Sequence, residues 1–125
     1  MTKEIQITKK QNKKFDLEER TLNFAKTCID VCKILTKDNI NSEIEGQLVR
    51  SAGSVGANYR EANDTITKKD FHHRIGICRR ESKESKYWLE LLLHSNVSLE
   101  NKINPLIDEA LQLARIFASI SNSRS

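Results

Sequence analysis

The chain has 125 residues, of which four are Gly and one is Pro, and a formal net charge of +4. This length suits one domain with its own core, and so few Gly and Pro residues leave little to separate many strands and turns, so the composition favours helices. No apolar run approaches the roughly 18 residues of a membrane span, and the charged N-terminus lacks the apolar segment of a secretory signal. We therefore expect a cytoplasmic protein that does not enter a membrane.

The basic residues are unevenly placed. Residues 1–14 contain five Lys and one Glu, so this segment alone has the net charge of the whole chain, and a second basic region lies between residues 50 and 86. Such asymmetry suggests a polyanionic partner, and the alternative is a solvated tail followed by ordinary helix surface. We expect a flexible basic lead-in at residues 1–15, one domain at residues 16–121 and a polar tail at residues 122–125.

The first predicted helix covers residues 16–37, with Asp16 as its N-cap. Apolar or small residues recur every three or four positions, which is typical of a helix that faces a core: Leu17, Thr21, Phe24, Cys28, Val31 and Leu35. Cys28 and Cys32 could offer two metal ligands, but no second ligand pair has a matching spacing. An odd number of cysteines also argues against disulfides, so buried free thiols are favoured.

The second predicted helix begins after Ser42, its expected N-cap, and its apolar positions keep their spacing as far as residue 62: Ile44, Leu48, Ala52, Val55, Tyr59 and Ala62. Gly53 and Gly56 lie inside it, and a Gly within a helix costs roughly 1 kcal/mol relative to Ala. Either another backbone packs closely on them, or they form a Gly-rich loop that holds an anion. The unbroken spacing favours close packing.

The third predicted helix begins at Thr67, with Asp70 in its first turn, and its core-facing positions have a small middle: Phe71, Ile75, Cys78, Ser82, Ser85, Leu89 and Leu92. If the second and third helices fold back around residue 65, Cys78 lies opposite Gly53 and small residues face small residues. The prediction for Glu81 and Glu84 is pairing with Lys or Arg one turn away on the same helix.

The last predicted helix begins near Ser98 or Asn101, with Pro105 in its first turn, and has the apolar positions Leu106, Ile107, Ala110, Leu111, Ala114, Phe117 and Ile120. Four helices with short connections predict an all-α fold, an antiparallel up-down-up-down four-helix bundle.

No motif indicates catalysis. The sequence has no P-loop and no nucleophile elbow, and the single Asp70-x-x-His73 pair lacks the partners that a di-iron bundle needs. We therefore expect no enzyme, no metal and no cofactor.

Basic residues near the turn between the second and third helices are candidates for phosphate contacts, which are salt-sensitive and largely independent of sequence. These candidate nucleic-acid-binding residues are Arg60, Lys68, Lys69, Arg74, Arg79 and Arg80. Tyr59, Tyr87 and Trp88 are the aromatic residues that could stack on bases, and each has a core or interface alternative, so readout of charge is favoured over readout of bases.

Three segments, FDLEERTLNFA, QLVRSAGSVGANYREA and KKDFHHRIGICRRESKESKYWLELL, resemble the four-helix-bundle proteins encoded in intervening sequences of bacterial large-subunit rRNA genes. The accessory variability proteins of diversity-generating retroelements share that fold. The resemblance implies a ring-shaped homopentamer with no catalytic residues that binds nucleic acid or a complex of reverse transcriptase and RNA.

On this basis we expect an oligomeric, non-enzymatic protein that binds nucleic acid, with RNA favoured over DNA. The alternative is an oligomeric adaptor that binds another protein without contacting nucleic acid. Residues expected to serve oligomer or helix packing are Arg50, Ala52, Gly53, Gly56, Asn58, Tyr59 and Glu61.

Overall fold

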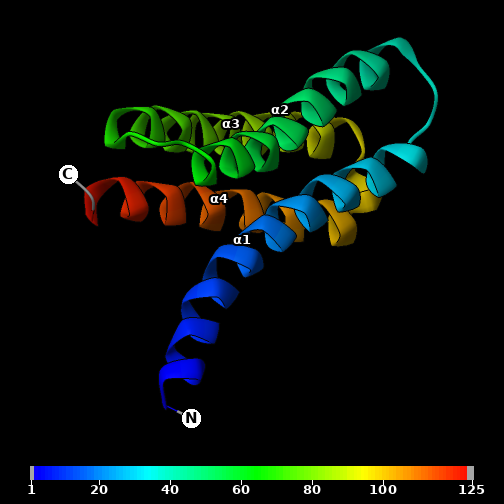
Figure 1. Cartoon of the computed structure of the whole chain (residues 1–125). Helices are drawn as coiled ribbons and strands as arrows, with labels where there is room; N and C mark the ends of the chain where they lie inside the picture. The colour runs from blue at the N-terminus through cyan, green and yellow to red at the C-terminus, as the bar shows by residue number, and fades with distance from the viewer. Residues whose placement is uncertain (1, 124–125) are drawn as a thin grey trace.

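The computed structural model describes residues 2–123, and within them the side chains of residues 16–122. Its helices are α1 (Thr2–Lys33), α2 (Asn39–Asn63), α3 (Lys68–Ser95) and α4 (Glu100–Ser123), with a short 3-10 turn, η1 (Val97–Leu99), before α4. Residues 2–123 contain no strand. Consecutive helices run in opposite directions (Figure 1), so the predicted all-α four-helix bundle is confirmed.

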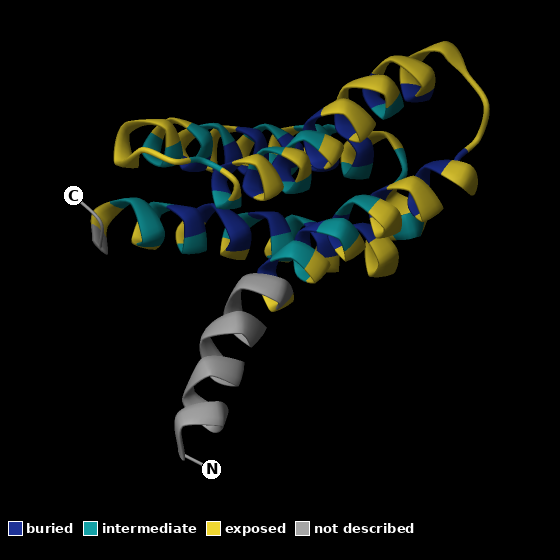
Figure 2. Cartoon of the chain, viewed as in Figure 1, coloured by how far each residue is buried: buried dark blue, intermediate teal, exposed yellow. Residues whose placement is uncertain are grey.

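The four helices do not pack equally. α3 packs extensively on both α2 and α4, whereas α1 packs chiefly on α2 and only lightly on α4. Buried residues line the facing sides of the helices (Figure 2). None of the helices in the described part of the chain has a stretch long and apolar enough to cross a membrane.

Helix starts differ from the prediction at α1 and α2. Asp16 lies inside α1 and is not its N-cap. The N-cap of α2 is Asp38 rather than Ser42, because the Asp38 carboxylate accepts a hydrogen bond from the Asn41 backbone N–H at 2.7 Å. The predicted flexible lead-in at residues 1–15 stays a prediction, because residue 1 and the side chains of residues 1–15 lie outside the described set, as do residues 124–125 of the predicted tail.

The start of α3 is as predicted. The Thr67 hydroxyl accepts a hydrogen bond from the Asp70 backbone N–H at 3.1 Å, which satisfies one of the unpaired donors of the first turn. α4 starts at Glu100, so Pro105 lies in its second turn rather than in its first.

The core consists of the predicted apolar stripes with few exceptions. The six positions named for the first helix and the six named for the second are all buried. Phe71 of α3 and three predicted positions of α4, Ile107, Leu111 and Ile120, are only half-buried. α4 also adds two fully buried residues that the prediction missed, Ile103 and Leu113.

Two asparagines join the connections at one end of the bundle. Asn41, at the start of α2, and Asn96, at the end of α3, exchange side-chain hydrogen bonds of 3.2 Å and 2.9 Å. Asn41 is 2% exposed, and its amide also donates to the Thr36 carbonyl at 2.9 Å. The α2–α3 turn lies at the opposite end of the bundle.

Candidate functional site

The predicted basic residues are spread along α3 instead of being gathered at the α2–α3 turn. Lys68 and Lys69 are the first residues of α3, and Arg79 and Arg80 lie three turns further on, about 17 Å from Lys68 along the helix axis. All four side chains are exposed, and none forms an ion pair with another residue among those described.

The two remaining basic candidates have partners within the chain. Arg74 is half-buried, and its guanidinium donates to the Asn58 side-chain oxygen at 2.9 Å. Asn58 in turn donates to the Ser54 carbonyl at 2.9 Å. Arg60 is more open, with its Nε 3.9 Å from the Glu18 carboxylate of α1. Arg74 and Asn58 therefore join α2 to α3. Their side chains have fewer hydrogen-bonding groups available to a ligand, because these intramolecular contacts already use some of them.

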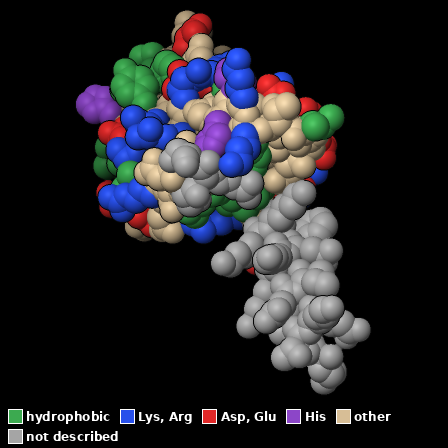
Figure 3. Space-filling view, turned by 60° about the vertical axis from the view of Figure 1, so that its left-hand side comes forward, with side chains coloured by type: hydrophobic (Ala, Val, Ile, Leu, Met, Phe, Trp, Pro, Cys, Tyr) green, Lys and Arg blue, Asp and Glu red, His purple; other side chains and the backbone are tan. Residues whose placement is uncertain are grey.

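One row of exposed residues follows the solvent face of α3. Its members recur at alternating steps of four and three, and together they are the α3 row: Lys69, His73, Gly76, Arg80, Lys83 and Tyr87. The row spans about 27 Å of helix. Figure 3 shows Lys and Arg side chains spread over much of the visible face of the bundle. Lys83 was not among the predicted site residues, although its helical spacing from Arg80 could have identified it.

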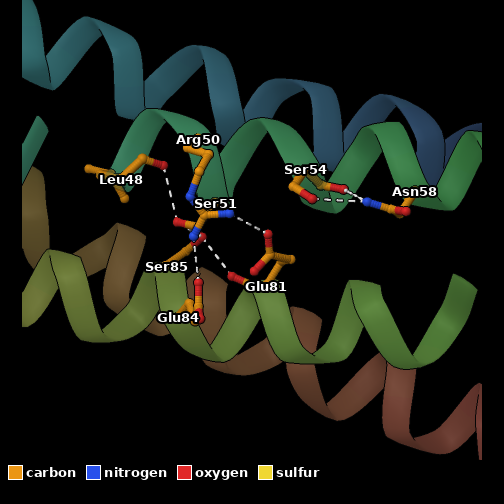
Figure 4. A network of polar contacts seen from close by, with 8 residues as sticks. All are labelled: Leu48, Arg50, Ser51, Ser54, Asn58, Glu81, Glu84 and Ser85. Carbon is orange, nitrogen blue, oxygen red and sulfur yellow. Dashed lines mark hydrogen bonds and ion pairs between the residues drawn. The ribbon is translucent and has the colours of Figure 1, made fainter. Parts of the chain in front are cut away.

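A polar network joins α2 to α3 (Figure 4). The Arg50 guanidinium donates to Glu81 at 2.9 Å and to Glu84 at 2.6 Å. The hydrogen bond from Arg50 lowers the pKa of Glu84, and the hydrogen bonds to Glu84 and Glu81 raise the pKa of Arg50. Next to this pair, the Ser51 and Ser85 hydroxyl oxygens lie 2.9 Å apart and are both fully buried.

This network corrects one prediction. Glu81 and Glu84 have their ion pairs with Arg50 of α2 and not with basic residues of their own helix. Arg50, expected to serve oligomer or helix packing, is paired within the chain, between α2 and α3. The Glu81 side chain is only 6% exposed, so water can compensate little of its negative charge, and the Arg50 guanidinium is the group that does so.

The two central glycines of α2 differ in their surroundings. A Cβ built on Gly53 meets no atom within 4 Å, and Cys78 lies opposite Val55, with its thiol 3.4 Å from the Val55 carbonyl oxygen. The predicted opposition of Gly53 and Cys78 is therefore wrong. A Cβ on Gly56 would lie 3.0 Å from Thr21 Oγ1, so Gly56 permits the close approach of α1.

Three other predicted packing residues of α2 have different positions. Ala52 and Tyr59 lie in the core, and the Tyr59 ring centroid is 5.8 Å from that of Phe117. Glu61 is exposed, and no ion pair with another described residue involves it.

The cysteines are buried free thiols, as the sequence predicted. Burial raises the pKa of Cys28 and of Cys78 to about 12 and that of Cys32 to about 11. Such thiols are almost wholly protonated at neutral pH, so they are poor nucleophiles. Within the described residues, no group of three or more His, Cys, Asp or Glu side chains could hold a metal ion.

Comparison with known proteins places this bundle in a family. The sequence pattern of the 23S rRNA-intervening sequence proteins matches residues 13–119. The chain belongs to this family. The match includes all of α2 and α3, most of α1 and α4, and all the predicted site residues. The family description says where such proteins are encoded and states no biochemical activity.

A solved structure supports the assignment. It is the crystal structure of a protein of unknown function from the S23 ribosomal protein family of Bacteroides thetaiotaomicron. That chain is 27% identical to this 23S rRNA-intervening sequence protein, with a TM-score of 0.73, and the similarity covers 84% of this chain and 97% of the other. No curated protein sequence matches the chain.

Proposed function

We propose that this chain is a non-enzymatic protein that binds nucleic acid, preferably RNA, through exposed cations on α3 and at the α2–α3 turn. The observation that carries this proposal is the set of side chains with free charge: Lys68, Lys69, Arg79, Arg80 and Lys83 are all exposed, and no described acidic group forms an ion pair with them. A cation without an intramolecular partner keeps its full charge for phosphates.

The charge balance of the chain favours a localised site. The net charge of +4 equals that of residues 1–14, so the chain from residue 15 onward is neutral overall. Its acidic groups are partly taken up by ion pairs on other faces, such as Arg20 with Glu109 at 2.7 Å between α1 and α4. The α3 row itself contains Lys69, Arg80 and Lys83 and no acidic residue, so it is locally positive although the chain from residue 15 onward is neutral overall.

We also propose that the chain assembles with itself, as a homopentamer. The solvent face of α2 supports this: Gly53 has open space beyond its Cα, Ala57 next to it is exposed, and Val49 is 40% exposed. Gly53 costs the helix roughly 1 kcal/mol relative to Ala, and no contact within the chain explains it. Close approach of another subunit would supply the reason.

The test of binding is fluorescence polarisation of a labelled single-stranded RNA at several salt concentrations. We expect binding that weakens steeply with salt, and the double variant Lys68→Glu with Lys69→Glu should reduce the slope of log K against log salt by about 1 to 2. A matched control, Lys26→Glu with Lys102→Glu, makes the same change in net charge at exposed lysines of α1 and α4 and should retain most of the affinity.

Light scattering on the same samples tests the assembly. A mass of five chains for both double variants, with lower RNA affinity only for Lys68→Glu with Lys69→Glu, supports the proposal. Equal affinity of the two double variants removes Lys68 and Lys69 from the site. An oligomer that binds no RNA at low salt refutes the proposed function and favours the adaptor alternative.

A further inference from the structure

A shallow groove lies on the solvent side of α3, further along the helix than the turn. It is open to solvent, has a volume of about 500 Å³ and is lined by seven residues of α3: Gly76, Arg79, Arg80, Lys83, Glu84, Tyr87 and Trp88. A Cβ at Gly76 would meet no atom within 4 Å, so the absence of a side chain there leaves one end of the groove open. The groove faces solvent along its length.

The groove is positively charged. Arg79, Arg80 and Lys83 have no ion-pair partner among the residues described, whereas the one acidic side chain in the lining, Glu84, receives a 2.6 Å hydrogen bond from Arg50. The negative charge of Glu84 is thus compensated mainly by Arg50 of α2, with a smaller electrostatic contribution from Arg80 of the groove. Three cations within two helical turns are left facing solvent.

The groove also presents an aromatic pair. Tyr87 is 56% exposed, a large fraction for an aromatic ring, and its ring packs edge-on against Trp88 with centroids 5.1 Å apart. Trp88 packs on the core and holds this ring pair in place. An exposed aromatic ring beside unpaired cations is the combination by which proteins hold single-stranded nucleic acid, because any base can stack on the ring while the cations contact the backbone.

We infer that this groove binds single-stranded nucleic acid, with one base stacked on Tyr87 and the adjoining phosphates held by Arg79, Arg80 and Lys83. The inference rests on the proposed function and makes it more specific: the ligand is single-stranded, and stacking of a base is added to the phosphate contacts. A duplex cannot use Tyr87 in this way, because its bases already stack on one another. An acidic peptide could use the cations but gains nothing specific from an exposed tyrosine.

Trp88 makes the test direct, because it is the only tryptophan of the chain. A base stacked on Tyr87 lies next to the indole, so titration with oligo(U) should quench the intrinsic fluorescence. Affinity is measured in parallel by polarisation of labelled oligo(U). Oligo(dT) distinguishes RNA from DNA: equal affinity indicates stacking and charge alone, and tighter binding of RNA indicates an added contact with the 2′-hydroxyl.

The decisive variants are Tyr87→Leu and Tyr87→Phe. We expect Tyr87→Leu to weaken binding of oligo(U) roughly 5- to 150-fold, the range for loss of one base–aromatic stack, with no change in the salt slope. Tyr87→Phe retains the ring and should bind like the parent protein. Arg80→Gln should instead reduce the salt slope by about 0.7. Circular dichroism checks that each variant is folded.

The outcomes separate this inference from the proposed function. Salt-sensitive binding of oligo(U) that neither quenches Trp88 nor depends on Tyr87 overturns the groove and leaves the proposed function intact. Binding of duplex RNA as tight as that of oligo(U), or equal quenching by poly-glutamate, also overturns it. Absence of any binding by either readout refutes both.

Discussion

Removal of the Arg50 side chain should measurably weaken the packing of α2 against α3. Truncation in Arg50→Ala leaves Glu81, whose side chain is only 6% exposed, without its 2.9 Å donor. A hydrogen bond to a charged group contributes about 1.5–3 kcal/mol. The pair with Glu84, whose side chain is 45% exposed, adds at most about 1 kcal/mol because water screens it. We expect a loss of about 2–3 kcal/mol at pH 7.

The assay is urea unfolding, followed by circular dichroism and by Trp88 fluorescence at one fixed protein concentration, because self-association would make stability depend on concentration. Glu84→Gln is the matched control, since it removes only the exposed half of the network and should cost less than about 1 kcal/mol. Equal losses for the two variants, or a loss below about 0.5 kcal/mol for Arg50→Ala, would refute the assignment of Arg50 as the partner of a buried carboxylate.

The effect should also depend on pH. The hydrogen bond from Arg50 lowers the pKa of Glu84 in the folded protein below the ordinary value of 4.5. A carboxyl group of this kind stabilises the fold fully above its unfolded pKa, and the stabilisation is lost as the pH falls through the folded pKa. The share of the Arg50→Ala effect that comes from Glu84, at most about 1 kcal/mol, should therefore be constant from about pH 6 upward and shrink below about pH 4.

Three further predictions concern the helices and the thiols. In the dissociated chain, Gly53→Ala should raise the free energy of unfolding by about 0.5–1 kcal/mol, because the added Cβ meets no atom of the same chain; in the proposed assembly the same Cβ would hinder the neighbouring subunit. Gly56→Ala should bring no gain, because its Cβ would lie 3.0 Å from Thr21 Oγ1; thermal unfolding of dissociated chains compares the two variants. Thr67→Ala should lower stability by about 1 kcal/mol through loss of the α3 cap, and Thr67→Ser should restore it. At pH 8 all three thiols should react slowly with a disulfide reagent in the folded protein and rapidly in urea. In the folded protein Cys32 should react fastest, because its pKa is raised least.

The sequence predicts the helices and most of the core because the three- and four-residue spacing of apolar side chains directly reflects which face of a helix is buried. Thr67 is also predicted correctly as the N-cap of α3, because capping involves only residues of one helical turn and so depends on local sequence. Asp38 is missed as the cap of α2 because Asp38 and Ser42 both have side chains that can cap, and only the backbone conformation decides between them.

Contacts between helices are predicted less well, because they depend on how one helix is placed against another. Local spacing favours partners for Glu81 on α3 itself, yet the nearest cation comes from α2. The same register places Val55 opposite Cys78 and leaves Gly53 facing solvent. In the candidate site, the positive charge of Arg79 and Arg80 can be read from the sequence. The groove could not be predicted, because it depends on the structure placing Gly76 and Tyr87 beside these cations on one face of α3.

The division of α3 into two faces has a consequence for how members of this family diverge. Its inner face supplies core residues such as Cys78 and Leu89, where a change of volume disturbs the packing of two neighbouring helices. The basic residues of its outer row are exposed, and substitutions at exposed positions usually alter stability by no more than about 0.5 kcal/mol. Lys69, Arg80 and Lys83 can therefore be exchanged in evolution at almost no cost to folding, so the charge of this face can change while the bundle stays the same.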